Sequence, residues 1–170
     1  MTRYVSVTLE KRAVRCLAKL LDEEAPRTAQ AVWDALPLGG QVYHGKYARN
    51  EIYALLPLFA QQDPGLENTT ITPIPGDLCW FSFSSDQLGN PAYGYAEGQG
   101  AADQSRVVDL AVFYGRNNLL INGDQGWVPG NVWGSIVEGL DELAAACQDI
   151  WMGGATGETL SFARAEAPAR

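Results

Sequence analysis

One stretch of the chain decides its fold, namely Asn131-Val132-Trp133-Gly134-Ser135-Ile136-Val137-Glu138-Gly139-Leu140-Asp141-Glu142-Leu143. Its first half, Val132–Val137, is rich in β-branched and aromatic residues and predicts a strand. Gly134 inside that strand is typical of a tight strand crossing, and Gly139 is typical of a turn into a helix. The helix is expected over Leu140–Cys147. The stretch therefore predicts a closely packed strand that turns directly into a helix.

Other segments of the chain also have the patterns of strands. They are Tyr4–Leu9, Val14–Leu21, Gln41–Tyr47, Asn50–Leu56, Leu78–Phe83, Val107–Tyr114 and Glu158–Ala165. The first two predict a hairpin. In the middle pair we expect Tyr43, Tyr47, Ile52 and Leu55 to face the core. About eight strands favour a mainly β, closed barrel, because closure removes exposed strand edges.

A second helix is predicted over Arg27–Leu36, after Pro26, so that two helices flank the barrel. Gln61–Asn68 and Asn117–Gly130 are expected to be loops. The glycine-rich segment Asp86–Ser105 predicts an exposed flap or long loop, and the sequence leaves open whether it is a lid. We expect one domain over residues 1–166 and a frayed tail over 167–170.

Composition excludes several classes of function. The chain has 170 residues and a net charge of −8, without a cluster of basic residues, which argues against nucleic acids and anionic membranes as partners. Cys16, Cys79 and Cys147 lie far apart, and His44 is the single histidine, so no zinc set is present and we expect no metal or cofactor. Without a signal segment or a long apolar run, we expect a cytoplasmic protein.

Two segments, near opposite ends of the chain, resemble cyclophilins. The run from Lys19 to Val32 resembles their second strand and first helix, with a consensus of roughly L-F-x-D-x-A-P-K-T-x-E-N-F. The stretch Asn131–Leu143 is similar to their run V-V-F-G-x-V-x-E-G-M-D-V-V. The segment from His44 to Tyr53 is also similar to the H-G-x-x-x-x-x-E-I-Y type found in uncharacterised prokaryotic proteins of cyclophilin-like fold. The resemblance implies an eight-stranded barrel capped by two helices.

The resemblance also implies a pocket that lacks the main hydrogen-bond donor of cyclophilins. In cyclophilins an arginine directly after F-H donates a hydrogen bond that favours the twisted X-Pro amide. Here Tyr43-His44-Gly45 places Gly45 at that position. The run Trp127–Asn131 is similar to a shortened W-L-D-G-K-H, with Asn131 near the place of its histidine. We therefore expect no efficient prolyl isomerase activity.

Polar and aromatic residues in these segments are the candidates for a ligand-binding pocket at the barrel. They are His44, Arg49, Glu51, Tyr53, Trp80, Phe113, Tyr114, Arg116 and Trp127. Each also has a structural interpretation. His44 could bond to the backbone, Arg49 and Glu51 could form a solvated ion pair on one strand face, and the tryptophans could pack in the core.

The leading hypothesis is a protein that binds a small carboxylate- or amide-bearing ligand, or a short peptide, in a barrel-side pocket. The alternative is a weak or divergent peptidyl-prolyl isomerase, or another small-molecule enzyme that uses His44, Arg49 and Glu51. A third hypothesis is a structural subunit whose exposed aromatic residues form a homo-oligomer.

Overall fold

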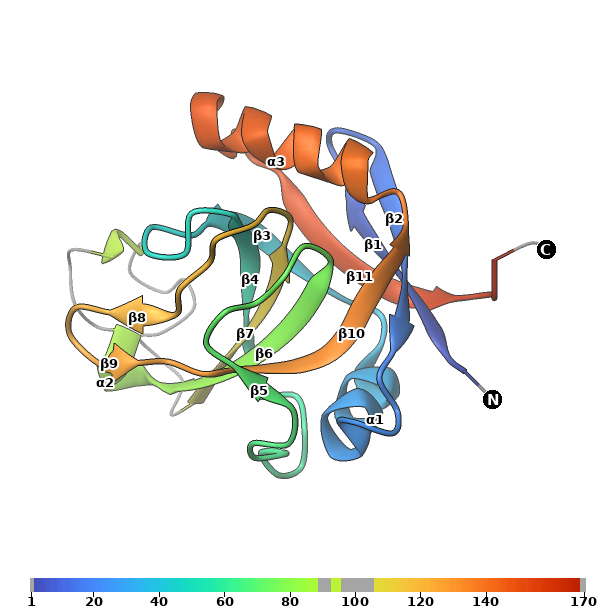
Figure 1. Cartoon of the computed structure of the whole chain (residues 1–170), viewed down its shortest axis with the longest axis horizontal. Coiled ribbons are helices and arrows are strands. Elements are labelled where there is room, and N and C mark those ends of the chain that lie inside the picture. Colours follow the sequence, from blue (N-terminus) through green and yellow to red (C-terminus); the bar gives the residue numbers. More distant parts are fainter. Residues whose placement is uncertain (1, 89–92, 96–105, 169–170) are drawn as a thin grey trace.

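The computed structural model shows a closed antiparallel barrel with a helix at each end (Figure 1). It describes residues 2–88, 93–95 and 106–168. The barrel strands are β1 (Tyr4–Leu9), β2 (Val14–Leu20), β3 (Leu38–His44), β4 (Glu51–Pro57), β6 (Asp77–Ser84), β7 (Arg106–Phe113), β10 (Gly130–Glu138) and β11 (Thr159–Ala165). Their order around the barrel is β2-β1-β11-β3-β4-β7-β6-β10, and β10 pairs again with β2 to close it. The predicted mainly β closed barrel is confirmed.

Short strands and three helices complete the described structure. The strands are β5 (Thr69–Thr70), which pairs with the start of β10, and the small hairpin of β8 (Ile121–Asn122) and β9 (Gly126–Trp127). The helices are α1 (Pro26–Ala35), α2 (Ser85–Leu88) and α3 (Leu140–Gly153). The sequence analysis expected two helices and missed the short α2. No helix within the described residues is long and apolar enough to cross a membrane.

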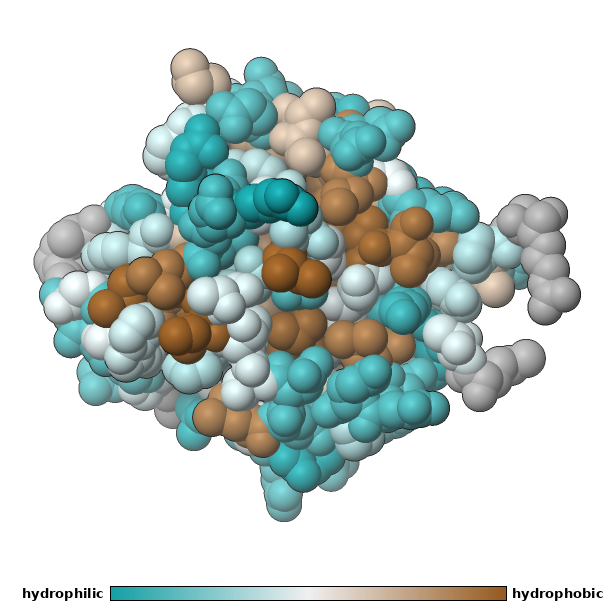
Figure 2. All heavy atoms as spheres, viewed as in Figure 1, coloured by the Kyte–Doolittle hydropathy of each residue, from teal (hydrophilic) through white to brown (hydrophobic). Residues whose placement is uncertain are grey.

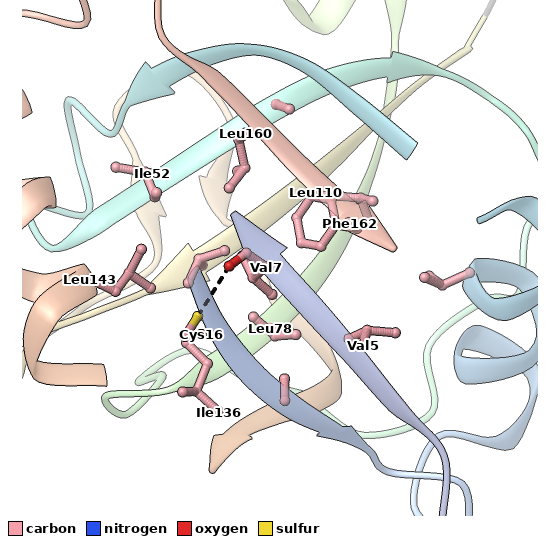
Figure 3. Close-up of a cluster of buried hydrophobic side chains, with 14 of the residues drawn as sticks. Val5, Val7, Cys16, Ile52, Leu78, Leu110, Ile136, Leu143, Leu160 and Phe162 are labelled. Atoms are coloured by element: carbon pink, nitrogen blue, oxygen red, sulfur yellow. Dashed lines mark hydrogen bonds between the residues drawn. The ribbon is translucent and has the colours of Figure 1, made fainter. Parts of the chain in front are cut away.

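The interior of the barrel is apolar because alternate residues of each strand point inward. Figure 3 shows this core, in which Val7, Ile52 and Phe162 are fully buried and the Cys16 thiol lies 3.6 Å from the carbonyl oxygen of Val7. Burial of such side chains contributes about 1.5–3 kcal/mol each. The packed core therefore holds the barrel strands in place, and their outer face is available for a binding site.

Three of the four predicted core positions in and next to β3 and β4 are corrected by the structure. Ile52 points into the barrel, whereas Leu55, three residues further along β4, packs on the outer face because an odd separation reverses the side. Tyr47 lies beyond the end of β3 and is 52% exposed. Tyr43 also packs against the outer cluster rather than in the barrel interior.

Two glycines allow the backbone of β10 and of the turn after it to pass close to neighbouring segments. A Cβ on Gly134 would lie 3.0 Å from Leu78 Cδ1 and 3.2 Å from the Lys19 carbonyl oxygen, so β10 passes tightly between its neighbours. Gly139 has φ of 81°, the left-handed conformation that glycine adopts without strain, and forms the turn into α3. Both roles agree with the sequence prediction.

The ends of several elements differ from the prediction. Strand β3 begins at Leu38 rather than Gln41, because Gly39 and Gly40 do not end the preceding segment but allow close pairing with β11. Helix α3 continues to Gly153, because Ile150 extends the buried stripe of Leu143 and Cys147 by one more turn. Of the predicted flap Asp86–Ser105, residues 89–92 and 96–105 lie outside the described residues.

Candidate functional site

A pocket lies on the outer face of the barrel, against β4, β6 and β7, with the β3–β4 loop and the β8–β9 hairpin at its rim. Its empty volume is about 710 Å³, including space open to solvent. Tyr53, Phe81 and Phe83 supply part of its aromatic lining. Figure 2 shows apolar side chains gathered over the β8–β9 region, where Ile121 is 44% exposed. The pocket has the apolar character of a small-molecule site.

Two carboxyl groups are the unusual feature of this pocket. Glu51 on β4 is 8% exposed, and Asp109 on β7 is 7% exposed. Burial raises the pKa of Glu51 to about 8. Burial, and then the nearby charge of Glu51, raise the pKa of Asp109 well above its ordinary value. Burial thus favours the protonated form of both groups, in which each carboxyl can donate as well as accept hydrogen bonds.

One oxygen atom of the Asp109 carboxyl is available to a ligand. This atom, Oδ1, is buried and has no hydrogen-bond partner among the described residues. An unpaired buried polar atom costs about 1–3 kcal/mol, so native proteins rarely leave one without a purpose. A ligand that hydrogen-bonds to this atom would remove that cost.

Gly45 provides the space that the Glu51 carboxyl occupies. A Cβ at position 45 would lie 2.7 Å from Glu51 Oε2 and 2.4 Å from the Ala48 carbonyl oxygen. The Gly45 amide donates to the Glu51 carbonyl oxygen at 2.8 Å, which holds the β3–β4 connection against the strand. The resemblance to cyclophilins implies an arginine at position 45, but no side chain fits there.

A group of tyrosines forms the aromatic part of the pocket. The hydroxyl oxygens of Tyr53 and Tyr95 are 2.5 Å apart, and the rings of Tyr43 and Tyr53 stack with centroids 5.5 Å apart. Burial, together with the neighbouring acidic groups, raises the pKa of Tyr53 far above its ordinary value. These hydroxyls remain protonated and serve as neutral hydrogen-bonding groups.

Among the described residues that line the pocket, Lys46 is the one with a basic side chain. Its Nζ donates to the carbonyl oxygen of Tyr93 at 2.6 Å. The Tyr93 hydroxyl in turn donates to Asp124 Oδ2 at 2.9 Å, next to the β8–β9 hairpin. This chain of contacts joins the β3–β4 loop to the rim of the pocket on the far side.

His44, Arg49 and Tyr114 lie together elsewhere, beneath the C-terminal half of α3. His44 Nε2 is 2.7 Å from the Tyr114 hydroxyl, and its Nδ1 is 3.0 Å from the Gly45 carbonyl oxygen. The rings of His44 and Trp151 lie 4.8 Å apart, and the Arg49 guanidinium stacks on the same tryptophan at 5.1 Å. Burial, reinforced by Arg49, lowers the pKa of His44 although the bond to Gly45 opposes it.

The other predicted site residues are dispersed. Trp80 points into the barrel and packs edge-on against Phe59 at 4.9 Å. Phe113 is fully buried in the outer apolar cluster beneath the pocket. Arg116 is exposed, and Trp127, 58% exposed, borders a second hollow that shares Phe81 and Phe83 with the pocket. Of the nine candidates, Glu51 and Tyr53 line the pocket.

Asn131 has a structural position rather than one in the pocket. Its Oδ1 accepts hydrogen bonds from the amides of Glu67 and Asn68, at 3.2 and 3.0 Å. Its Nδ2 donates to Thr28 Oγ1 at 2.7 Å and to the Gly65 carbonyl oxygen at 3.0 Å. The buried amide therefore ties the loop before β5 to helix α1.

The sequence analysis missed Asp109, Lys46 and the role of Gly45. Asp109 had a usable signal, since it is a lone acid within the apolar strand Arg106–Phe113. An acidic residue in such a strand is rarely buried unless it is paired or functional. No group of acidic, histidine and cysteine side chains within the described residues is arranged to hold a metal ion.

Solved structures with related folds include three that are distant in sequence. McbB, solved in complex with tryptophan, has 18% identity and a TM-score of 0.61 over 98% of this chain and 46% of its own, so this chain spans less than half of McbB. The hypothetical protein AF2241 from Archaeoglobus fulgidus has 20% identity and a TM-score of 0.52, covering 96% and 95% of the two chains. The mimivirus cyclophilin has 13% identity and a TM-score of 0.47, covering 96% and 87%.

Sequence comparison places the chain in a family. No functionally curated protein shows significant similarity to it. The model of a family described as "Protein of unknown function (DUF3830)" matches residues 7–162, which is most of the chain. The predicted kinship with an uncharacterised family is thereby confirmed, and the chain belongs to the DUF3830 family.

Proposed function

We propose that the protein binds a small amide-bearing ligand in the pocket on the outer face of β4, β6 and β7, and that it lacks efficient prolyl isomerase activity. The unpaired, buried Oδ1 of Asp109 within an aromatic lining carries this proposal. An amide offers both an N–H donor and a carbonyl acceptor. A protonated carboxyl has the complementary pair of groups.

The charges of the pocket favour an amide over a carboxylate. Glu51 and Asp109 are already held in their neutral forms by burial, and a third carboxyl would have to lose its hydration in the same apolar space. Arg49 and Arg116, the cations that the sequence offered for an anion, are not among the residues that line the pocket. A neutral amide carries no such cost of burying a charge.

The absence of room at Gly45 supports the second part of the proposal. Stabilising a twisted X-Pro amide requires a donor aimed at the peptide, and the space beside Gly45 is taken by Ala48 and Glu51. Arg49 does not replace that donor, since its guanidinium stacks on Trp151. A protease-coupled assay with an Xaa-Pro peptide should therefore show no acceleration above background.

The alternative of an enzyme that uses His44, Arg49 and Glu51 receives less support. The Glu51 carboxyl lines the pocket, whereas the other two side chains pack against Trp151. Acid–base catalysis requires such groups within hydrogen-bond reach of one substrate.

We also propose a cytoplasmic location, which the unpaired thiols of Cys16, Cys79 and Cys147 support.

Isothermal titration with a matched pair of probes tests ligand binding. Phenylacetamide should bind, and phenylacetate, which has the same ring but a charged head group, should bind at least about tenfold more weakly, a difference of about 1.4 kcal/mol. Asp109→Leu should abolish the binding of phenylacetamide. Asp77→Asn is the control, because that carboxyl accepts a hydrogen bond from Ile74 outside the pocket. Equal binding of both probes, or binding that survives Asp109→Leu, would refute the proposal.

A further inference from the structure

The pairing of β4 with β7 places the two buried carboxyls at different positions along the pocket. Glu51 lies opposite Phe113, and Asp109 lies opposite Leu55. Glu51 and Leu55 are four residues apart on one strand and face the same side. At roughly 3.3 Å per residue, the two acidic positions are therefore separated by about 13 Å along the strands.

The wall between the two carboxyls is mainly apolar, apart from the bonded hydroxyls of Tyr53 and Tyr95. Tyr53 and Ala111 form the rung of the ladder halfway between them. Phe81, on the neighbouring strand β6, lies opposite Asp109 and extends the aromatic wall. The small side chain of Ala111 leaves the Tyr53 ring to define the middle of the pocket, with Phe81 beside Asp109 at one end.

We propose that the pocket binds an elongated ligand with an amide group at each end of an apolar chain, one amide contacting Glu51 and the other Asp109. This inference rests on the proposed function and deepens it by naming the class of ligand. The apolar chain lies against Tyr53 and Phe81, and each end meets a carboxyl that can accept from the amide nitrogen.

The charged groups around the pocket favour neutral ends over ammonium groups. Lys46, which donates to the Tyr93 carbonyl oxygen, places a positive charge at the rim, and Asp124, which accepts from the Tyr93 hydroxyl, places a negative charge there, so the rim does not select for a cation. An ammonium group would also have to displace the protons that Glu51 and Asp109 hold. Tyr53 and Tyr95, whose hydroxyls bond to each other, contribute no charge.

Calorimetric titration with linear probes of similar chain length tests this inference. Adipamide carries an amide at both ends, and hexanamide carries one on a chain of the same length. We expect adipamide to bind at least about tenfold more tightly, since each additional satisfied hydrogen bond is worth about that factor. Malonamide is too short to reach both carboxyls and should bind no better than hexanamide.

Variants at each end show whether both carboxyls take part. Glu51→Met and Asp109→Leu replace each acid with an apolar side chain of similar size. Glu51→Met should lower the affinity for adipamide to that of hexanamide, and Asp109→Leu should abolish binding, as it does for phenylacetamide. If either variant fails to fold, Glu51→Gln and Asp109→Asn are used instead; they keep the shape and a neutral donor and acceptor, so the adipamide-to-hexanamide ratio should be preserved, and its loss would refute the contact at that end. Asp77→Asn should leave the ratio unchanged.

The outcomes separate this inference from the proposed function. If hexanamide binds as tightly as adipamide while phenylacetamide also binds, recognition at two ends is refuted and the amide site stands. If hexamethylenediamine binds more tightly than adipamide, the neutral character of the ends is refuted. If none of the amides binds, the proposed function fails together with the inference.

Discussion

Replacing Glu51 with glutamine should make the stability of the protein less sensitive to pH. The wild-type carboxyl is buried, and its pKa is raised from 4.5 to about 8 in the folded state. In the unfolded chain it ionises near its ordinary pKa. Folding above about pH 4.5 therefore requires the group to remain protonated, or to ionise in an apolar site, and both cost free energy.

The direction and size of the effect follow from this shift. A raised pKa in the folded state means that the stability is fully present below the unfolded pKa and falls as the pH rises towards about 8. Each pKa unit corresponds to about 1.36 kcal/mol, so the loss between about pH 5 and pH 8 amounts to at most roughly 4 kcal/mol. Glutamine does not titrate, and Asp109 alone would leave the variant a smaller slope.

Urea denaturation at several pH values measures this difference. The free energy of unfolding of Glu51→Gln, relative to wild type, should rise by a few kcal/mol between about pH 5 and pH 8. Glu158→Gln is a control for which the opposite pH dependence is expected. Burial alone would raise the pKa of Glu158, but hydrogen bonds from the amides of Lys11 and Thr159, and from Arg12, lower it, so its contribution is lost in acid. A stability difference for Glu51→Gln that does not vary with pH would refute the reasoning.

Three further substitutions test other parts of the structure. Gly45→Ala should lower the free energy of unfolding by about 1–3 kcal/mol, because its Cβ would approach the Ala48 carbonyl oxygen to 2.4 Å; an unchanged urea midpoint would show that the loop relaxes instead. Asn131→Ala should cost about 2 kcal/mol by the same measurement, since it leaves two half-buried backbone amides unpaired, and a loss within error would contradict the role given to this amide. Trp151→Ala should raise the pKa of His44 towards its ordinary value by exposing the imidazole, as followed by NMR titration of the ring protons; an unchanged pKa would mean that Trp151 does not shield it.

The sequence was sufficient to predict the barrel because most of its strands have a recognisable local pattern of residues. Tyr4–Leu9 alternates clearly, and its predicted and observed bounds agree. Gly139 marks the turn into α3 because few other residues adopt its positive φ. The predicted strand began at Gln41 and left out Gly39 and Gly40, because sequence alone does not distinguish glycine in a closely packed strand from glycine in a turn.

The site was less predictable because it depends on which way each side chain faces. Glu51 and Tyr53 could be identified because they alternate with apolar residues along β4. In β7 nearly every residue is buried on one side or the other, so alternation does not show that Asp109 faces outward. His44 and Gly45 are neighbours in the chain, but the structure places His44 against Trp151 and Gly45 beside Glu51 in the pocket, and a prediction of the local strand alone could not identify these distant partners.

The central claim is that the outer face around Glu51 and Asp109 binds amides, and isotope-edited NMR during a titration with adipamide tests it most directly. The account predicts that the amide signals of Tyr53, Asp109 and Ala111 shift in a saturable way. Signals of His44 and Trp151, which do not line the pocket, should remain in place. Saturable shifts confined to the region of His44 and Trp151, or no saturable shifts at all, would contradict the account.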